Sequence, residues 1–132
     1  MKNFTFEQST GKWFGPDGKY VVTGYAGGNC GNNPEGINNP DMQDRPNIGP
    51  LPEGLYKKGK LVLESHLGKY AIELIPDPSN NMFDRSDFYC HGDTERPHCA
   101  SEGCIILPHD NRVAFYESPV QYVRVVKEYN VE

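Results

Sequence analysis

Residues 87–107 read DFYCHGDTERPHCASEGCIIL, a stretch in which two short strand-like runs flank a polar connection. The first run, Asp87–His91, ends at a histidine, and the second, Cys104–Leu107, begins at a cysteine. Aromatic and β-branched residues favour strands, whereas Gly, Pro and Asp interrupt them. A histidine at one strand end and a cysteine at another can meet across a sheet, so the stretch predicts a β-rich fold that carries a chemical site.

The N-terminal part of the chain also predicts strands. Side chains alternate in type over Phe4–Gln8, with period two. Two further runs, Lys12–Phe14 and Lys19–Tyr25, flank the Gly-Pro-Asp-Gly turn at residues 15–18, which is typical of a hairpin. A segment rich in Gly, Asn and Pro follows at residues 26–54. A loop of this length is functional or disordered, and we interpret it as ordered and partly functional.

Short strand signals continue in the second half, together with one helix. The helix is predicted from Asp110 to Ser118, is stopped by Pro119, and would turn Val113, Phe115 and Tyr116 toward the sheet. The strand signals lie at Leu55–Lys57, Leu61–Glu64, Tyr70–Ile75 and Val120–Lys127. The sequence therefore predicts a single domain over residues 1–132 that is mainly β, with one or two short helices.

Composition narrows the class of protein. The chain has 132 residues, 36% of them apolar and 23% charged, with 14 Gly and 11 Pro, which fits one loop-rich globular domain. Its formal net charge is −5 and it has no basic run, so nucleic acid and anionic lipid are not expected as main partners. The N-terminus lacks the apolar stretch of a signal peptide, and no segment is long enough for a membrane span. We therefore expect a protein that is made in the cytoplasm without a signal peptide.

The first interpretation of the Cys- and His-rich stretch is a zinc site. Cys90, His91, His98, Cys99 and Cys104 offer suitable ligand atoms. However, no C-x-x-C pair is present, and Cys90 and His91 would point to opposite faces of one strand. We treat a zinc-stapled hydrolase as the minority alternative.

A disulfide is the second interpretation. Cys90 and Cys99 flank a loop that could close if their β-carbons meet, and such a bridge is compatible with catalysis by Cys104. It would be reduced in the cytoplasm and could form in an oxidising compartment. The sequence leaves this pairing open.

The third interpretation is a nucleophile with its base. Cys104 follows Ser101-Glu102-Gly103, and Gly103 permits a sharp turn that brings backbone N–H groups close to a bound substrate. The amides of Gly103 and Cys104 could then hold an oxyanion, with His91 as the base that activates the thiol. The alternative is that Cys104 is an inert core residue in a non-catalytic module.

These residues resemble a known signature. His91-Gly92 followed by the Ser101–Leu107 run is similar to the YkuD-type L,D-transpeptidase pattern of a His-Gly strand end, a short spacer, Ser/Thr-His-Gly-Cys and an apolar tail. The closer resemblance is to type VI secretion effectors with an L,D-transpeptidase-like domain. Those carry a Gly-Asn-rich segment, G-P-L/I-P-x-G-x-Y, H-G-D/N and S-x-G-C-I-I-L-P. Here these motifs lie at residues 27–34, 49–56, 91–93 and 101–108, so the resemblance covers about Phe14 to Pro108.

The resemblance implies a β-sandwich-like L,D-transpeptidase domain that acts on peptidoglycan stem peptides. Cys104 would attack the carbonyl of the third stem residue and expel the terminal D-alanine. Water would then give L,D-carboxypeptidase activity, and a D-amino acid would give exchange. His91 would be the base, with the Gly92 carbonyl orienting it. No metal or other cofactor is expected.

The resemblance also implies partners and a place of action. We expect a cognate immunity protein, a secretion machinery, and action as an antibacterial toxin in the periplasm of target bacteria. Two departures from the transpeptidase pattern favour cleavage or exchange over cross-linking. Glu102 replaces the usual histidine and Ile106 replaces an arginine or asparagine. The Glu102 carboxylate beside the nucleophile would by itself disfavour a thiolate, so a cationic His91 would have to outweigh it.

Several nearby polar residues are candidates for substrate contact. Ser101 would bind substrate or cap the turn, and Asp93 would orient His91 or close an Asx-turn at Gly92. Tyr56 would pack in the core or present its hydroxyl to substrate.

Charged residues of the connection complete the candidate set. His98 and Glu102 lie close to Cys104 in the sequence and could contact substrate, although a solvated loop position is the commoner role of such residues. Arg96 and Arg45 could pair with the carboxylates of a stem peptide. A non-catalytic cell-wall-binding module remains the functional alternative to an enzyme.

Overall fold

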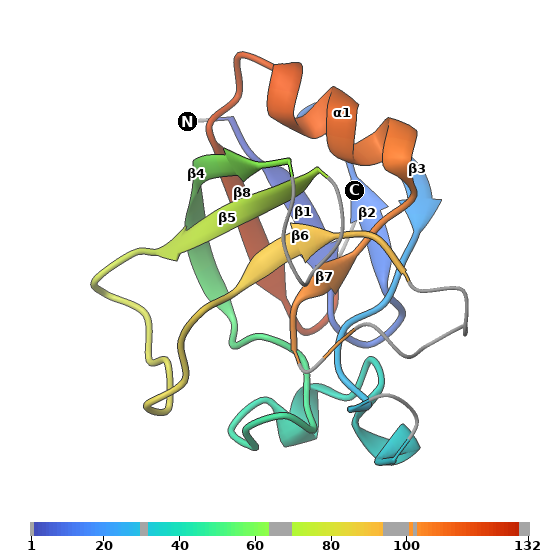
Figure 1. Cartoon of the computed structure of the whole chain (residues 1–132), viewed down its shortest axis with the longest axis vertical. Helices are drawn as coiled ribbons and strands as arrows, with labels where there is room; N and C mark the ends of the chain where they lie inside the picture. Colours follow the sequence, from blue (N-terminus) through green and yellow to red (C-terminus); the bar gives the residue numbers. More distant parts are fainter. Residues whose placement is uncertain (1, 30–31, 64–69, 94–100, 102, 130–132) are drawn as a thin grey trace.

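The computed structural model describes residues 2–29, 32–63, 70–93, 101 and 103–129 (Figure 1). Within these ranges eight strands form one mixed sheet in the order β3-β2-β1-β8-β4-β5-β6-β7. The strands are β1 (Phe4–Glu7), β2 (Lys12–Phe14), β3 (Tyr20–Thr23), β4 (Gly54–Val62), β5 (Ala71–Pro76), β6 (Tyr89–His91), β7 (Ile105–Ile106) and β8 (Tyr122–Val126). The helices are α1 (His109–Glu117) and two 3₁₀ turns, η1 (Pro34–Gly36) and η2 (Pro40–Met42). The mainly β class predicted from the sequence is confirmed.

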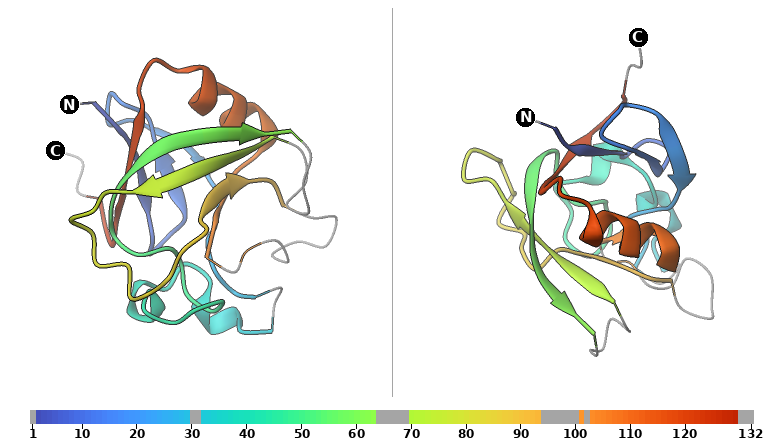
Figure 2. Two further views of the ribbon diagram at one scale, coloured as in Figure 1. Left: turned by 60° about the vertical axis from the view of Figure 1, so that its left-hand side comes forward. Right: turned by 90° about the horizontal axis from the view of Figure 1, so that it is seen from above.

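The sheet curls until its two ends meet. β3 and β7 are the outermost strands in the sheet order. Two residues beyond β3, Tyr25 forms an antiparallel bridge with Ile106 of β7, with N···O distances of 3.2 and 2.8 Å. The two layers expected of a sandwich are therefore opposite halves of one curled sheet, as the view from above shows (Figure 2). Through this bridge, the segment after β3 lies beside β7, the strand that follows Cys104.

Neighbouring strands are mostly antiparallel. β2 and β3 pair around the predicted Pro-Asp-Gly turn. Two pairs are parallel instead, β1 with β8 and β6 with β7. The second of these parallel pairs joins the two strand-like runs that flank the polar connection at residues 92–103.

An aromatic cluster seats α1 on the sheet. Phe4 of β1, Trp13 of β2 and Phe115 of α1 lie with ring centroids 5.0–5.2 Å apart, Phe4 stacked on Trp13 and Phe115 edge-on to both. Such contacts add to the hydrophobic gain of burying three large rings. Figure 1 shows α1 lying across one end of the curled sheet.

The helix begins and ends within one residue of the predicted bounds, but its buried face differs. Phe115 is fully buried as expected, whereas Tyr116 is 38% exposed. The second buried position of α1 is Arg112, three residues before Phe115 and so on the same face. The expectation that Tyr116 faces the sheet is therefore wrong.

β4 is one strand where the sequence predicted two. Its pairing with β5 is irregular between Lys58 and Leu61, at the Lys-Lys-Gly-Lys run that suggested a break. The side chain of Lys58 is buried and its Nζ donates to the carbonyl oxygens of Phe115, Tyr116 and Ser118 at 2.8–3.1 Å. The ammonium group of Lys58 therefore donates hydrogen bonds to backbone carbonyls at the C-terminal end of α1, and its positive charge is favourable at that end of a helix.

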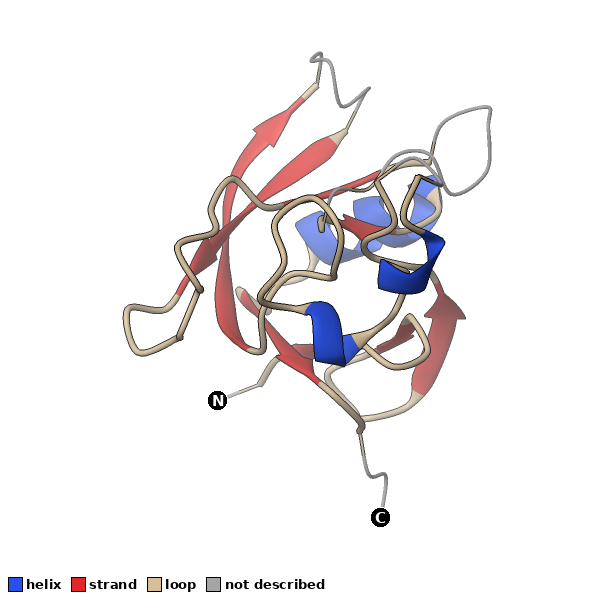
Figure 3. Cartoon of the chain, turned by 90° about the horizontal axis from the view of Figure 1, so that it is seen from below, coloured by secondary structure: helices blue, strands red, loops and turns tan. Residues whose placement is uncertain are grey.

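The Gly, Asn and Pro-rich segment lies at the end of the molecule opposite α1 (Figure 3). It contains η1 and η2, each with proline in its first turn, a position that suits proline because its missing N–H would have no helical partner. The interpretation of this segment as ordered is confirmed for its described residues. In the described part of the chain, the longest helix has nine residues and none could cross a membrane.

Candidate active site

The register of β6 and β7 brings His91 and Cys104 onto one face of the sheet. Cys90 pairs with Ile105 and His91 with Ile106, so one residue earlier Tyr89 lies opposite Cys104. The Tyr89 N–H donates to Cys104 Sγ at 3.4 Å, in agreement with that register. Side chains alternate along a strand, so His91 and Cys104 project from one face, and Cys90 projects from the other.

The imidazole of His91 has a defined tautomer. The side chain is 1% exposed, and Nδ1 lies 3.0 Å from the carbonyl oxygen of Gly92. A carbonyl oxygen only accepts, so Nδ1 carries the proton and Nε2 is the basic nitrogen of the neutral ring. The Gly92 carbonyl thus holds the position that the sequence resemblance implied for a group orienting His91.

Two backbone groups contact the sulfur of Cys104. The Tyr89 N–H donates to Sγ, and the thiol donates to the Asp87 carbonyl oxygen at 3.9 Å. An amide donor stabilises a thiolate, whereas a carbonyl acceptor stabilises the protonated thiol. The side chain is 9% exposed, so a charge on this sulfur is poorly solvated and depends on nearby protein groups.

The hydroxyl of Ser101 ties the loop of the nucleophile to the Gly-Asn-rich segment. It accepts from the N–H groups of Gly27 at 2.8 Å and Gly103 at 3.0 Å, and donates to the Cys104 carbonyl at 2.7 Å. A hydroxyl has one donor and two acceptor positions, so all of them are used within the protein. The fully buried Ser101 therefore holds the turn that carries Cys104. Because the Gly103 amide donates to Ser101, it does not serve the predicted oxyanion site in this arrangement.

Both glycines beside the pair lie against a buried guanidinium. Gly103 has φ +139°, and a Cβ there would lie 2.5 Å from Arg85 Nη2. A Cβ on Gly92 would lie 2.8 Å from Arg112 Nη2. The backbone conformation favours glycine at residue 103, whereas a side chain at residue 92 would require the Arg112 guanidinium to shift.

Sequence reasoning missed these two arginines. Arg112 donates from Nη1 to the Tyr70 carbonyl at 3.2 Å, and burial lowers its pKa while Cys90 opposes that change. Its helical spacing of three from Phe115 was a signal that it faces inward. Arg85 belongs to the loop before β6, where no periodicity distinguishes it from a surface arginine.

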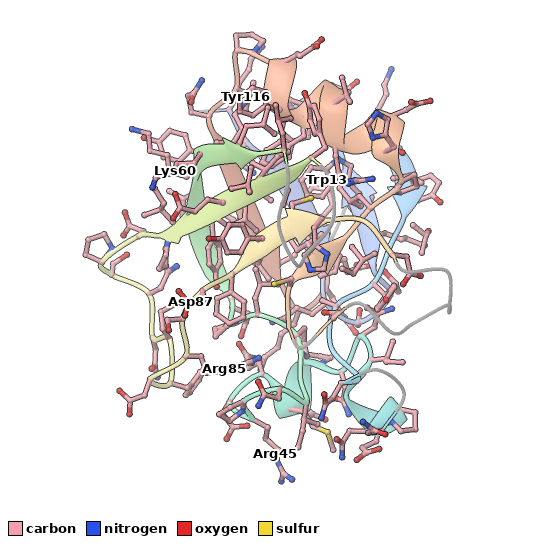
Figure 4. All side chains as sticks on the ribbon, in the orientation of Figure 1. Trp13, Arg45, Lys60, Arg85, Asp87 and Tyr116 are labelled. Carbon is pink, nitrogen blue, oxygen red and sulfur yellow. The ribbon has the colours of Figure 1, made fainter. Side chains whose placement is uncertain are left out.

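Arg85 holds the segment around Gly49 against the site. Nη1 donates to the carbonyls of Gln43 and Pro50 at 2.6 and 2.7 Å, and Nη2 donates to Gly49 at 3.1 Å. Figure 4 shows Arg85 directed into the molecule, whereas Arg45 points outward. Burial lowers the pKa of Arg85, and attraction to nearby acidic groups, Cys104 among them, opposes that change.

A family model described as the Tlde1 domain matches residues 24–130. The chain belongs to the Tlde1-domain family. This family comprises type VI secretion effectors with L,D-transpeptidase-like character. No curated protein and no solved structure is significantly similar to the chain. The match includes every candidate site residue and begins just after β3.

Two predicted substrate contacts of the Tlde1 domain have other partners in the structure. Tyr56 is fully buried and its hydroxyl donates to the Pro52 carbonyl at 2.6 Å, so it packs in the core, which is the first of the two roles expected from the sequence. Burial also raises the pKa of its phenol. The exposed Asp93 accepts from the Tyr25 hydroxyl at 2.7 Å, which links the sheet-closing bridge to the residue two positions after His91.

Other predicted residues of the Tlde1 domain, Arg96, His98 and Glu102, lie outside the described residues, as does Cys99. The zinc and disulfide interpretations both depend on Cys99. Cys90 is a free, fully buried thiol whose pKa is raised by burial. Within the described ranges no three His, Cys, Asp or Glu side chains are grouped to bind a metal.

Proposed function

We propose that this Tlde1 domain is a cysteine-dependent enzyme that cleaves the terminal D-alanine from peptidoglycan stem tetrapeptides, or exchanges it for another D-amino acid. The observation that carries the proposal is the parallel register of β6 and β7, which projects His91 and Cys104 from one face, with His91 Nδ1 on the Gly92 carbonyl. Membership of an effector family with L,D-transpeptidase-like character supports the same chemistry.

The first half-reaction forms a thioester. His91 Nε2 accepts the thiol proton, and Cys104 Sγ attacks the carbonyl carbon of the third stem residue. The tetrahedral oxyanion collapses, and the departing D-alanine amine takes the proton from His91. The backbone N–H of Cys104 is the candidate oxyanion donor, since that of Gly103 donates to Ser101.

The second half-reaction regenerates the thiol. Water, deprotonated by His91, attacks the thioester carbonyl, and the product is a stem tripeptide with a carboxylate. A D-amino acid amine in place of water forms a new peptide bond instead. In both cases the proton returns from His91 to Cys104 Sγ, so the enzyme needs no external oxidant or cofactor.

The biological setting follows from the family. We propose a toxin that is exported by a type VI secretion machinery, acts in the periplasm of target bacteria, and is neutralised by a cognate immunity protein in the producer. Peptidoglycan stem peptides are its proposed substrate class.

The test uses disaccharide-tetrapeptide muropeptides and mass spectrometry. We expect the parent chain to remove one alanine, and Cys104→Ala to be inactive with an unchanged circular dichroism spectrum. Cys90→Ala is the matched control, because Cys90 projects from the opposite face, and it should retain activity. Equal alanine release by the parent and Cys104→Ala would contradict the proposal. Adding a second D-amino acid to the same assay separates exchange from hydrolysis.

A further inference from the structure

Arg85 touches both chain segments that hold the sulfur of Cys104. Its guanidinium lies against Gly103, the residue that precedes Cys104, at the place where a Cβ would be. It also lies over the ring of Phe88, 5.1 Å from the centroid. Phe88 sits between Asp87 and Tyr89, whose backbone groups contact Sγ. The positively charged guanidinium of Arg85 therefore packs against the two chain segments that surround Cys104.

The charge on Arg85 is permanent and poorly screened. Arginine is not deprotonated in proteins, and this side chain is only 7% exposed. Charges interact more strongly when buried than at a surface, because water screens them less. Asp44 and Cys104 are described residues whose negative charge is attracted to Arg85, and Tyr56 interacts with it through a phenol that burial keeps protonated.

A buried thiolate at Cys104 requires such a charge. Among the described residues, the titratable or charged groups close to Cys104 are His91 on the same face of the sheet, Arg85 from the loop before β6, and Cys90, which projects from the opposite face but interacts electrostatically with Cys104. Glu102 lies outside the described residues. The guanidinium keeps its charge whether or not His91 Nε2 holds the thiol proton, so Arg85 favours the thiolate throughout the proton transfer from Cys104 to His91.

We propose that Arg85 is a positioning residue whose fixed positive charge stabilises the thiolate of Cys104. The inference rests on the proposed function only in taking Cys104 as the nucleophile. Its three donations to the carbonyls of Gln43, Gly49 and Pro50 hold the guanidinium in place, so the charge cannot move away from the sulfur.

The experiment measures alkylation of the full chain by iodoacetamide as a function of pH, mapped to each cysteine by mass spectrometry. The readout is the midpoint, the pH at which the alkylation rate of Cys104 is half of its maximum. The rate at a single pH is not used, because the nucleophilicity of a thiolate itself changes with its pKa. Arg85→Gln should raise the midpoint of Cys104 by about one pH unit or more, a tenfold loss of thiolate below the midpoint. Arg85→Lys retains the charge and should keep most of the parent midpoint.

The matched control is Arg124→Gln, which removes one positive charge from an exposed position of β8. It should leave the midpoint unchanged. Cys90 provides an internal reference, because burial raises its pKa and should keep it unlabelled. Urea unfolding of each variant identifies those that remain folded.

Three results would overturn the inference: a folded Arg85→Gln with the parent midpoint, an upward shift of a full unit in folded Arg85→Lys, or a parent midpoint at the ordinary thiol value of about 8.5. If Arg85→Gln does not fold, the midpoint of Cys104 in the parent chain still tests the inference, because a value near about 8.5 would show that the thiolate is not stabilised. The chain could also prove inactive on muropeptides while the midpoint of Cys104 still depends on Arg85. That result would contradict the proposed function and support the role of Arg85.

Discussion

Ser101 connects the turn that carries Cys104 to the Gly-Asn-rich segment. Its buried hydroxyl makes three hydrogen bonds to the backbone, two of them to the turn that carries Cys104. We expect Ser101→Ala to lower the free energy of unfolding by about 1–3 kcal/mol, because two buried amides and a carbonyl lose their partner. Catalytic turnover should fall as well, since the turn that positions Cys104 loses its support.

Urea unfolding and muropeptide turnover measure the two effects of Ser101→Ala. Ser79→Ala is the control, because the exposed Ser79 hydroxyl bonds only the neighbouring Asp77 carboxylate. That variant should stay within about 0.5 kcal/mol of the parent. Unchanged stability with weaker substrate binding in Ser101→Ala would return Ser101 to the substrate-contact role.

Residue by residue, the sequence drew attention to His91 and Cys104 as a proposed reactive pair, and their catalytic roles stay a prediction. His91 and Cys104 were recognisable because they end and begin strand-like runs with glycine beside each. Arg85 was not, because an arginine that packs against a glycine has the same sequence signature as one in solvent, and Arg112 had only its spacing of three from Phe115 as a signal. What separates them is burial, which depends on residues far away in the chain.

At the scale of the element, Lys58 connects β4 to the end of α1. We expect Lys58→Met to destabilise the fold by about 1–3 kcal/mol, because three carbonyls near the helix end lose a charged donor. Lys57→Met, at the exposed neighbouring position, is the matched control. Thermal or urea unfolding would measure the difference, and equal stability of the two variants would show that the buried lysine makes no net contribution.

The same lysine explains why β4 was predicted as two strands. A Lys-Lys-Gly-Lys run resembles a polar loop between two apolar runs. In the fold one of these lysines points inward to α1, so the strand continues through them with an irregular register. Local sequence could not anticipate this, because the carbonyls that receive Lys58 lie about 60 residues later in the chain.

On the scale of the whole molecule, the strands that precede the Tlde1 match belong to its core. β8 lies between β1 and β4, and β1 pairs with β8 over four residues. Deleting residues 1–14 would remove β1, β2 and two members of the aromatic cluster, Phe4 and Trp13. We expect the shortened chain to lose its cooperative unfolding transition.

Near-UV circular dichroism and urea unfolding test that expectation. A control that deletes only residues 1 and 2 should behave as the full chain, because these residues precede β1. A cooperative transition in the chain lacking residues 1–14 would mean that the matched segment folds alone. The closure of the sheet through Tyr25 and Ile106 would then be sufficient to hold it.

The parallel pairing of β6 and β7 has a consequence for how this family can diversify. The relative placement of His91 and Cys104 is set by a hydrogen-bond ladder, Cys90 with Ile105 and His91 with Ile106, and not by the length of chain that joins them. We expect residues inserted between Asp93 and Ser101 to leave both the ladder and the hydrogen bonds of Ser101 in place. A family member could therefore differ in this connection and keep the same pairing of Cys90 with Ile105 and of His91 with Ile106.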